Sequence, residues 1–263
     1  MNRPYFKIWI LITSTIILFT WFSSFETINL FGKEFKSSGI YDAITNIEEK
    51  STDSVINSIK APEKIATQKV IKSEMDTMPK SILFIGDSML EGLGARMAAY
   101  AKENGHKLHN VIWYSSTSKT WGSCDTLKYF IRKFKPNFII VSLGANELFV
   151  KNITSKRHQN VKRILFQIKE IPYVWIGPPN WKEDTGINDL IASLAKPGTF
   201  FLSKGMHFDR SKDGAHPTRL SSALWMDSVA RWIKLHSAYP IKLSEPKVKT
   251  ARANSTTILQ PTR

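Results

Sequence analysis

Cysteine is nearly missing from this chain of 263 residues, which contains only Cys124. A single cysteine excludes an internal disulfide and a cysteine-rich zinc site, and the neighbours of Cys124 are not those that activate a thiol nucleophile. We therefore expect Cys124 to be a small buried hydrophobic residue. Clusters with metal-ligand spacing and phosphate-binding glycine loops are also missing, so the sequence predicts neither a metal nor a cofactor.

Acidic residues are scarce relative to basic ones: 22 Asp and Glu stand against 37 Lys and Arg, a formal net charge of +15. Such an excess suggests an anionic partner. The basic residues are, however, scattered along the chain, without a basic helix, a zinc-finger signature or an RNA-binding signature. We therefore expect no nucleic-acid binding. A basic exterior that faces acidic glycans or anionic lipid head groups fits the charge.

One long stretch lacks charge altogether: Ile8 to Phe25 is mostly apolar and follows Arg3 and Lys7. At about 1.5 Å per residue, a helix of this length spans the hydrocarbon core of a bilayer. The alternative is a cleavable signal peptide, but bulky residues stand where its cleavage site needs small ones. We predict that residues 1–31 are a cytoplasmic N-terminus and a signal anchor. The chain would then cross the inner (cytoplasmic) membrane once, with its remainder on the periplasmic or extracytoplasmic side.

The rest of the chain divides by composition into three parts. Residues 32–80 are rich in Lys, Glu, Ser, Thr and Asp and predict a polar linker. Residues 242–263 carry a basic excess and prolines without periodicity, which predicts a disordered basic tail. Residues 81–241 lie between them and have the patterns of a folded domain.

Within residues 81–241, short apolar runs alternate with amphipathic stretches. The runs predict strands near 81–85, 109–114, 137–143, 173–176 and 199–202, and the stretches predict helices near 89–104, 125–134, 155–169, 184–195 and 217–236. This alternation is typical of a three-layer α/β/α fold whose central sheet is mostly parallel. In such folds, reactive groups gather at the carboxyl ends of the strands.

Polar residues suited to acyl transfer follow three of these elements. Ser88 lies in Gly-Asp-Ser after the first strand, and Asn146 follows the third. Asp213 and His216 precede the last helix. A serine hydroxyl needs a base such as His216, and a carboxylate three residues earlier would fix the tautomer of the imidazole. The alternative is that the serine caps a helix, the asparagine bonds its own backbone and the histidine lies on the surface.

These motifs resemble the SGNH/GDSL hydrolase superfamily over about residues 81–236. The resemblance implies a flavodoxin-like fold, with Ser88 as nucleophile, Asp213 and His216 as acid and base, and the Ser88 N–H and Asn146 as oxyanion donors. The chain departs from the family pattern at Glu147, where Asp is usual. The glycine donor of the second block is also displaced, so that either Gly122 or a serine N–H near Ser118 would serve.

Tryptophans near the expected pocket are candidates for substrate binding. Trp121 and Trp181 lie in loops after strands, where they would stack on a sugar ring or pack against the domain. Trp225 and Trp232 lie seven residues apart on the last predicted helix, and we expect both in the core.

These observations predict a membrane-anchored serine esterase. Its substrate would be a small ester, an O-acetyl group on a cell-envelope or extracellular glycan, and its membrane contact would be the N-terminal helix. The glycan and the acetyl group follow from the predicted location and the family resemblance. Two alternatives remain open: an O-acetyltransferase that uses the same acyl-enzyme, and a non-catalytic glycan-binding domain.

Overall fold

The computed structural model describes residues 14, 27–30, 33–36 and 74–261, and the chain divides into two units, residues 1–64 and 65–263. In the first unit, β1 (Thr27–Leu30) pairs with β2 (Lys33–Lys36) in an antiparallel two-stranded sheet. The predicted anchor helix and most of the predicted linker lie outside the described residues. No helix in the described ranges has the length and apolar character needed to cross a membrane.

The second unit is built on a six-stranded sheet in which every pair of neighbours is parallel. The strand order is β7-β6-β5-β3-β4-β8. The strands are β3 (Ser81–Gly86), β4 (Lys107–Trp113), β5 (Phe138–Ser142), β6 (Tyr173–Ile176), β7 (Phe200–Phe201) and β8 (Ser255–Leu259). The middle strands are buried on both faces, which explains their unbroken apolar runs.

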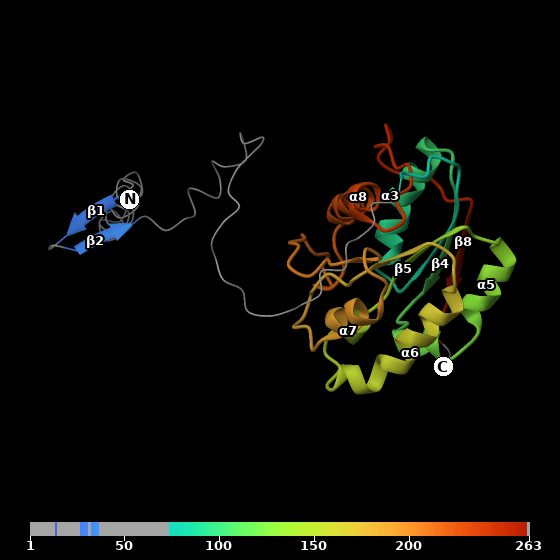
Figure 1. The fold of residues 1–263 in the computed structure, drawn as a ribbon, viewed down its shortest axis with the longest axis horizontal. Coiled ribbons are helices and arrows are strands. Elements are labelled where there is room, and N and C mark those ends of the chain that lie inside the picture. The colour runs from blue at the N-terminus through green and yellow to red at the C-terminus, as the bar shows by residue number, and fades with distance from the viewer. Residues whose placement is uncertain (1–13, 15–26, 31–32, 37–73, 262–263) are drawn as a thin grey trace, which may run out of the picture. The chain divides into compact units, whose positions relative to one another are not determined.

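Helices cover both faces of this sheet (Figure 1). They are α3 (Leu90–Glu103), α4 (Ser118–Gly122), α5 (Thr126–Phe134), η1 (Ala145–Glu147), α6 (Ile153–Ile168), α7 (Ile187–Leu194) and α8 (Arg219–His236). One buried cluster joins the sheet to α3 and α8, and a second joins its other face to α5, α6 and α7. The predicted three-layer α/β/α architecture is thus confirmed, and the sheet is entirely parallel.

The prediction of a disordered tail is wrong. From residue 242 to residue 261 the chain has a defined path, and β8 extends the sheet by pairing with β4. Before β8, the Asn254 side chain accepts the Leu108 N–H at 2.7 Å, while the Asn254 N–H donates to the Leu108 carbonyl at 2.9 Å. A parallel strand needs mainly its backbone to pair, so the polar composition of this segment did not prevent it from joining the sheet.

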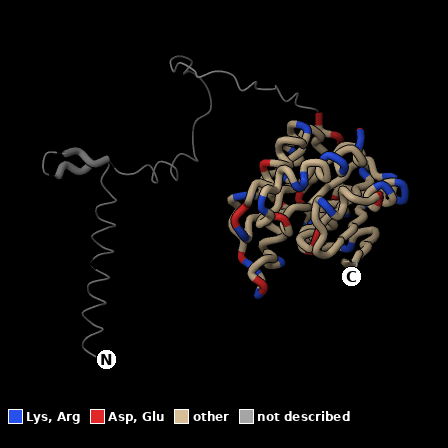
Figure 2. Tube along the Cα trace, turned by 90° about the horizontal axis from the view of Figure 1, so that it is seen from below, with Lys and Arg blue, Asp and Glu red and all other residues tan. Residues whose placement is uncertain are grey.

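Two predictions about single side chains have different outcomes. Trp225 is fully buried in the core and Trp232 is partly buried against it, as expected. Cys124 is only half-buried, and its Sγ lies 3.3 Å from the Thr120 carbonyl oxygen. In the view of Figure 2, Lys and Arg lie on several separate segments of the domain, interspersed with Asp and Glu.

Candidate active site

Ser88 lies in the turn between β3 and α3, at the carboxyl edge of the sheet. A side chain at Gly86 would come within 2.5 Å of the Ser142 carbonyl oxygen, so only glycine lets β3 lie this close to β5 at its end. The Asp87 N–H donates to the same oxygen at 3.2 Å. Within the described part of the chain no hydrogen bond uses the Ser88 N–H, which leaves this donor free for a substrate.

Asp213 and His216 lie in the loop that leads into α8. The Asp213 carboxylate accepts the N–H groups of Ala215 and His216, both at 2.9 Å, and Gly214 between them has φ of +70°. Its other oxygen lies 2.6 Å from His216 Nδ1. This bond places the imidazole proton on Nδ1, so that Nε2 is free to accept a proton.

The loop folds back so that His216 Nε2 lies 2.8 Å from Ser88 Oγ. The two residues are 128 positions apart in the sequence. Ser88, His216 and Asp213 thus form a continuous hydrogen-bonded line, the arrangement in which an imidazole removes the proton of a serine hydroxyl. The expected proximity of these three side chains is therefore found.

Two carboxyl groups near Ser88 have opposite pKa shifts. Hydrogen bonds from the His216 and Ala215 N–H groups lower the pKa of Asp213 to about 2, so it stays ionised beside the imidazole. Complete burial raises the pKa of Asp87 to about 7, partly offset by the Met89 N–H, and the charge of Glu147 raises it further. One Asp87 oxygen accepts the Met89 N–H at 3.0 Å, and the other makes no hydrogen bond among the residues that the structure describes.

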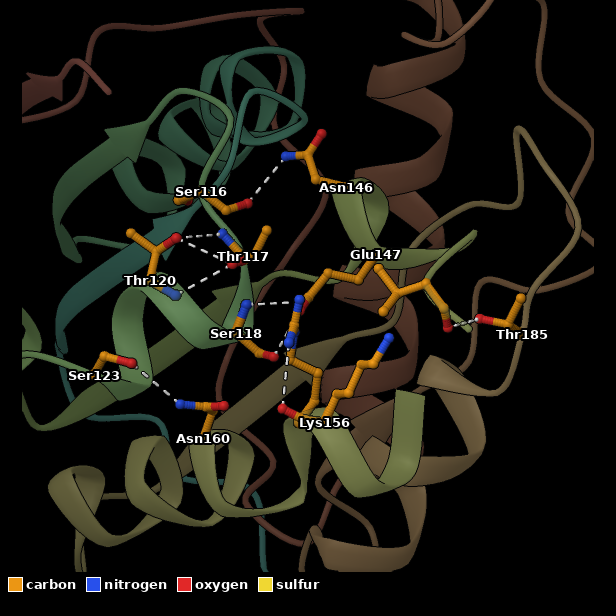
Figure 3. Close-up of polar contacts among 12 residues, drawn as sticks. Ser116, Thr117, Ser118, Thr120, Ser123, Asn146, Glu147, Lys156, Asn160 and Thr185 are labelled. Carbon is orange, nitrogen blue, oxygen red and sulfur yellow. Dashed lines mark hydrogen bonds and ion pairs between the residues drawn. The ribbon is translucent and has the colours of Figure 1, made fainter. Parts of the chain in front are cut away.

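Asn146 reaches the same edge from the neighbouring strand. β3 and β5 are adjacent, so the loops that follow them, which contain Ser88 and Asn146, start at neighbouring positions of the sheet edge. Its side-chain amide donates to the Ser116 carbonyl at 3.0 Å, as Figure 3 shows. An amide nitrogen has two hydrogens, so a second one remains for a substrate oxygen.

Glu147 is fully buried and holds the loop after β4 in place, a role that the sequence did not reveal. Its carboxylate accepts the Ser118 N–H at 2.7 Å and the Ser118 hydroxyl at 3.0 Å (Figure 3). Arg157 of α6 donates to it from Nε at 2.5 Å. The signal in the sequence was the departure from the usual Asp, because the extra methylene of Glu lengthens the reach of the carboxylate.

Gly122 and Ser118, the two residues suggested as a further oxyanion donor, both make structural contacts. A side chain at Gly122 would come within 2.5 Å of the Asn160 carbonyl oxygen, so this glycine allows α4 and α6 to pack closely. The Ser118 N–H is already bonded to Glu147. The expectation is therefore not met for the Ser118 N–H, and for the Gly122 N–H it stays a prediction.

The two candidate tryptophans differ in exposure. Trp121 is fully buried and its indole N–H donates to the Ser116 hydroxyl at 3.0 Å, so its expected role in substrate binding is wrong. Trp181 is partly exposed and donates to the carbonyl of Ala145, next to Asn146, at 3.0 Å. The Phe149 ring lies edge-on at 6.2 Å and Lys182 Nζ lies 4.9 Å from the Trp181 ring. Trp181 thus remains a candidate for substrate contact.

Comparisons with known proteins find similarity only among solved structures. No protein-family model and no curated protein matches the chain. A protein described as lipolytic and of the G-D-S-L family, from Desulfitobacterium hafniense DCB-2, is 16% identical with a TM-score of 0.46. That match covers 58% of this chain and 98% of the other.

Two further structures have the same low identity of 16%. The psychrotrophic esterase EstA from Pseudoalteromonas sp. has a TM-score of 0.45, and the match covers 59% of this chain and 96% of that one. A salicylyl-acyltransferase from a tetracycline biosynthetic pathway has a TM-score of 0.44, with 60% and 55% covered. The chemistry considered below follows from the side chains of this chain itself.

Proposed function

We propose that this protein is a serine esterase that cleaves a small ester through an acyl-enzyme on Ser88. The observation that carries the proposal is the line from Ser88 Oγ to His216 Nε2, at 2.8 Å, and from His216 Nδ1 to Asp213, at 2.6 Å. In this line His216 is the base and Asp213 holds its tautomer and stabilises the imidazolium that forms. In the described part of the chain, no group of three or more His, Cys, Asp or Glu side chains is placed to hold a metal.

The reaction begins when Ser88 Oγ attacks the ester carbonyl and passes its proton to His216 Nε2. The negative charge that develops on the carbonyl oxygen is stabilised by the free Ser88 N–H and by the second amide hydrogen of Asn146. The tetrahedral intermediate collapses and the alcohol leaves with the proton from His216. Water then attacks the acyl-enzyme with His216 again as base, which releases the acid and restores Ser88.

The finer parts of the proposal concern the substrate and its location. We propose an O-acetyl group on a cell-envelope or extracellular glycan, and a single membrane-spanning anchor at Ile8 to Phe25. The apolar run with Arg3 and Lys7 before it supports the anchor, and the basic excess of the chain is compatible with an acidic envelope surface.

The proposal is tested by labelling the full-length protein with a fluorophosphonate probe and by measuring a panel of acetyl esters. Ser88→Ala should abolish both labelling and hydrolysis without a change in the circular dichroism spectrum. The matched control is Ser228→Ala on α8, where the hydroxyl donates to the Leu224 carbonyl at 3.0 Å, and it should leave both unchanged. A folded wild-type protein that neither labels nor cleaves any ester would instead support the non-catalytic alternative.

A further inference from the structure

A cleft opens beside Ser88, between α3, α8 and the C-terminal segment. Its volume is about 460 Å³, and Ser88 and His216 lie in its lining. This volume falls within the roughly 300–1,000 Å³ of typical small-molecule sites, and it far exceeds what a methyl or ethyl group would fill. The cleft therefore has room for a substantial part of a substrate that reacts at Ser88.

The lining also indicates which part of the substrate enters. His216 gives its proton to the departing alcohol, so the alcohol oxygen must lie on the imidazole side of Ser88. The cleft extends on that side, since Pro217 and Arg219, which follow His216 in the chain, belong to its lining. The proposed oxyanion donor Asn146, in contrast, does not belong to it.

The chemistry of the walls is mixed. Polar side chains that can bond hydroxyl groups alternate with small apolar ones that leave space. Besides Ser88, His216 and Arg96, the polar ones are Glu91, Arg219, Ser222 and Thr250, and the small ones are Gly92, Ala95, Ala223 and Ala251. A sugar offers hydroxyl groups to these polar side chains and flat apolar faces to the alanines, whereas an aliphatic chain could use only the apolar part of the lining.

One wall comes from the C-terminal segment that the sequence predicted to be disordered. Arg96 of α3 fixes this segment by donating from Nη1 to the carbonyls of Val248 and Lys249 at 3.0 and 3.2 Å. The Arg96 Nε donates to Asp227 of α8 at 2.6 Å, which ties both helices to the segment. The Ala251 N–H adds a bond of 3.3 Å to the Ala95 carbonyl. The wall is thus anchored to α3 at the cleft itself, whose lining includes Ala95 and Arg96.

We propose that this cleft binds the alcohol portion of the ester, a polyhydroxylated alcohol of sugar type, and that the C-terminal segment limits its size. The assignment rests on the proposed esterase function. It also applies to acyl transfer, because an acceptor alcohol that attacks the acyl-enzyme must approach from the side by which the first alcohol left.

The test fills the cleft from two walls and varies the two halves of the ester separately. Ala251→Phe and Ala223→Phe each place a ring in the cleft. Ala253→Phe is the matched control, because Ala253 lies on the same segment but lines the neighbouring groove, which shares Ala251 with the cleft but does not include Ser88 or His216. The substrates are an acetylated monosaccharide, methyl acetate and methyl hexanoate. Hydrolysis by the full-length protein is followed in a pH-stat, which titrates the acid that is released.

We expect both cleft variants to lower kcat/KM for the acetylated sugar by at least about tenfold. Both methyl esters should change less than about twofold, and Ala253→Phe should resemble the wild type on all three substrates. A loss of kcat/KM on methyl hexanoate alone would overturn the proposal, because it would assign the cleft to the acyl chain. A cleft variant whose kcat/KM changes by the same factor on all three substrates would overturn it as well.

The failure of this proposal differs from the failure of the proposed function. Suppose that the wild-type protein labels with a fluorophosphonate and cleaves methyl acetate, but the cleft variants affect all substrates equally. The proposed esterase function then stands and only the assignment of the cleft fails. A wild-type protein that does not label and cleaves none of the esters refutes both. Thermal unfolding of each variant shows whether its phenylalanine disturbs the fold. If one variant is disturbed, the variant in the other wall decides the assignment of the cleft.

Discussion

Glu147→Gln is the most informative single change outside the Ser88, His216 and Asp213 line. It keeps the shape of the side chain but removes the charge that Arg157 and Ser118 bind. Glu147 is fully buried and the Arg157 side chain is only 16% exposed, so neither water nor salt can compensate for the lost partner. Breaking a buried ion pair by removing one charge costs about 3–5 kcal/mol.

For a domain of this size, each kcal/mol lowers Tm by about 2–4 °C, so Glu147→Gln should lower it by roughly 6–20 °C. Asp125→Asn is the matched control, because Asp125 pairs with Arg163 at 3.4 Å while both side chains are more than half exposed. An exposed pair of this kind contributes about 1 kcal/mol or less. Tm is measured for the full chain by tryptophan fluorescence and by circular dichroism.

The same change should also affect catalysis, because Ser118 follows Ser116, whose carbonyl accepts the Asn146 amide. When the loop loses its anchor at Glu147, Asn146 loses a fixed partner, and kcat should fall more than KM rises. If Glu147→Gln melts no lower than Asp125→Asn, the buried carboxylate does not stabilise the domain. If kcat is also unchanged at a temperature where the variant is folded, it does not position Asn146 either.

Three further predictions follow from the geometry. Asp213→Asn should lower kcat by up to about 10⁴-fold through the wrong imidazole tautomer. Because the Asp213 pKa is about 2, the wild-type rate should show no titration of this carboxyl above about pH 4, and a pH–rate profile of both proteins checks this. For Asp87, a folded-state pKa of about 7 against a usual 3.8 means that stability is fully present below about pH 4 and is lost as the pH rises through 7. At 1.36 kcal/mol per pH unit the loss is about 4 kcal/mol at most, and roughly 3 kcal/mol of it falls between pH 5 and pH 8. Urea unfolding at these two pH values measures that part, and Asp87→Asn should remove it. Truncation after Ala253 removes β8 and should lower Tm and speed amide exchange in β4, and unchanged exchange would show that the pairing contributes no protection.

Much of the fold could be predicted from the sequence because the inner strands are buried on both faces. The runs that become β3, β5 and β6 are almost continuously apolar, and β6 has the bounds that the sequence predicted. β8 could not be recognised in the same way. It reads Ser-Thr-Thr-Ile-Leu, lies at the edge of the sheet and alternates between half-buried and exposed positions, so its burial leaves a weak pattern.

The candidate site shows the same contrast between local and distant information. The sequence could predict that Ser88, Asp213 and His216 lie close together. Each belongs to a short motif next to a predicted strand or helix, and a parallel sheet brings such motifs to one edge. Trp121 and Gly122 could not be placed, because the loop after β4 turns at once into α4, which packs against α6. The packing of Gly122 against Asn160 of α6 is a long-range contact, and the sequence pattern does not contain it.

The buried carboxylate of Glu147 determines which donors remain for the negative charge of the transition state. It takes the Ser118 N–H, so that the proposed donors to the oxyanion are the Ser88 N–H and one amide hydrogen of Asn146. Each donor to an oxyanion contributes about 3–4 kcal/mol in other hydrolases. With two such donors rather than three, the loss of Asn146 would leave only a single N–H. In the proposed mechanism the rate would therefore depend on the contacts that hold Asn146, and the loop beside it is fixed by Glu147 in the interior of the domain.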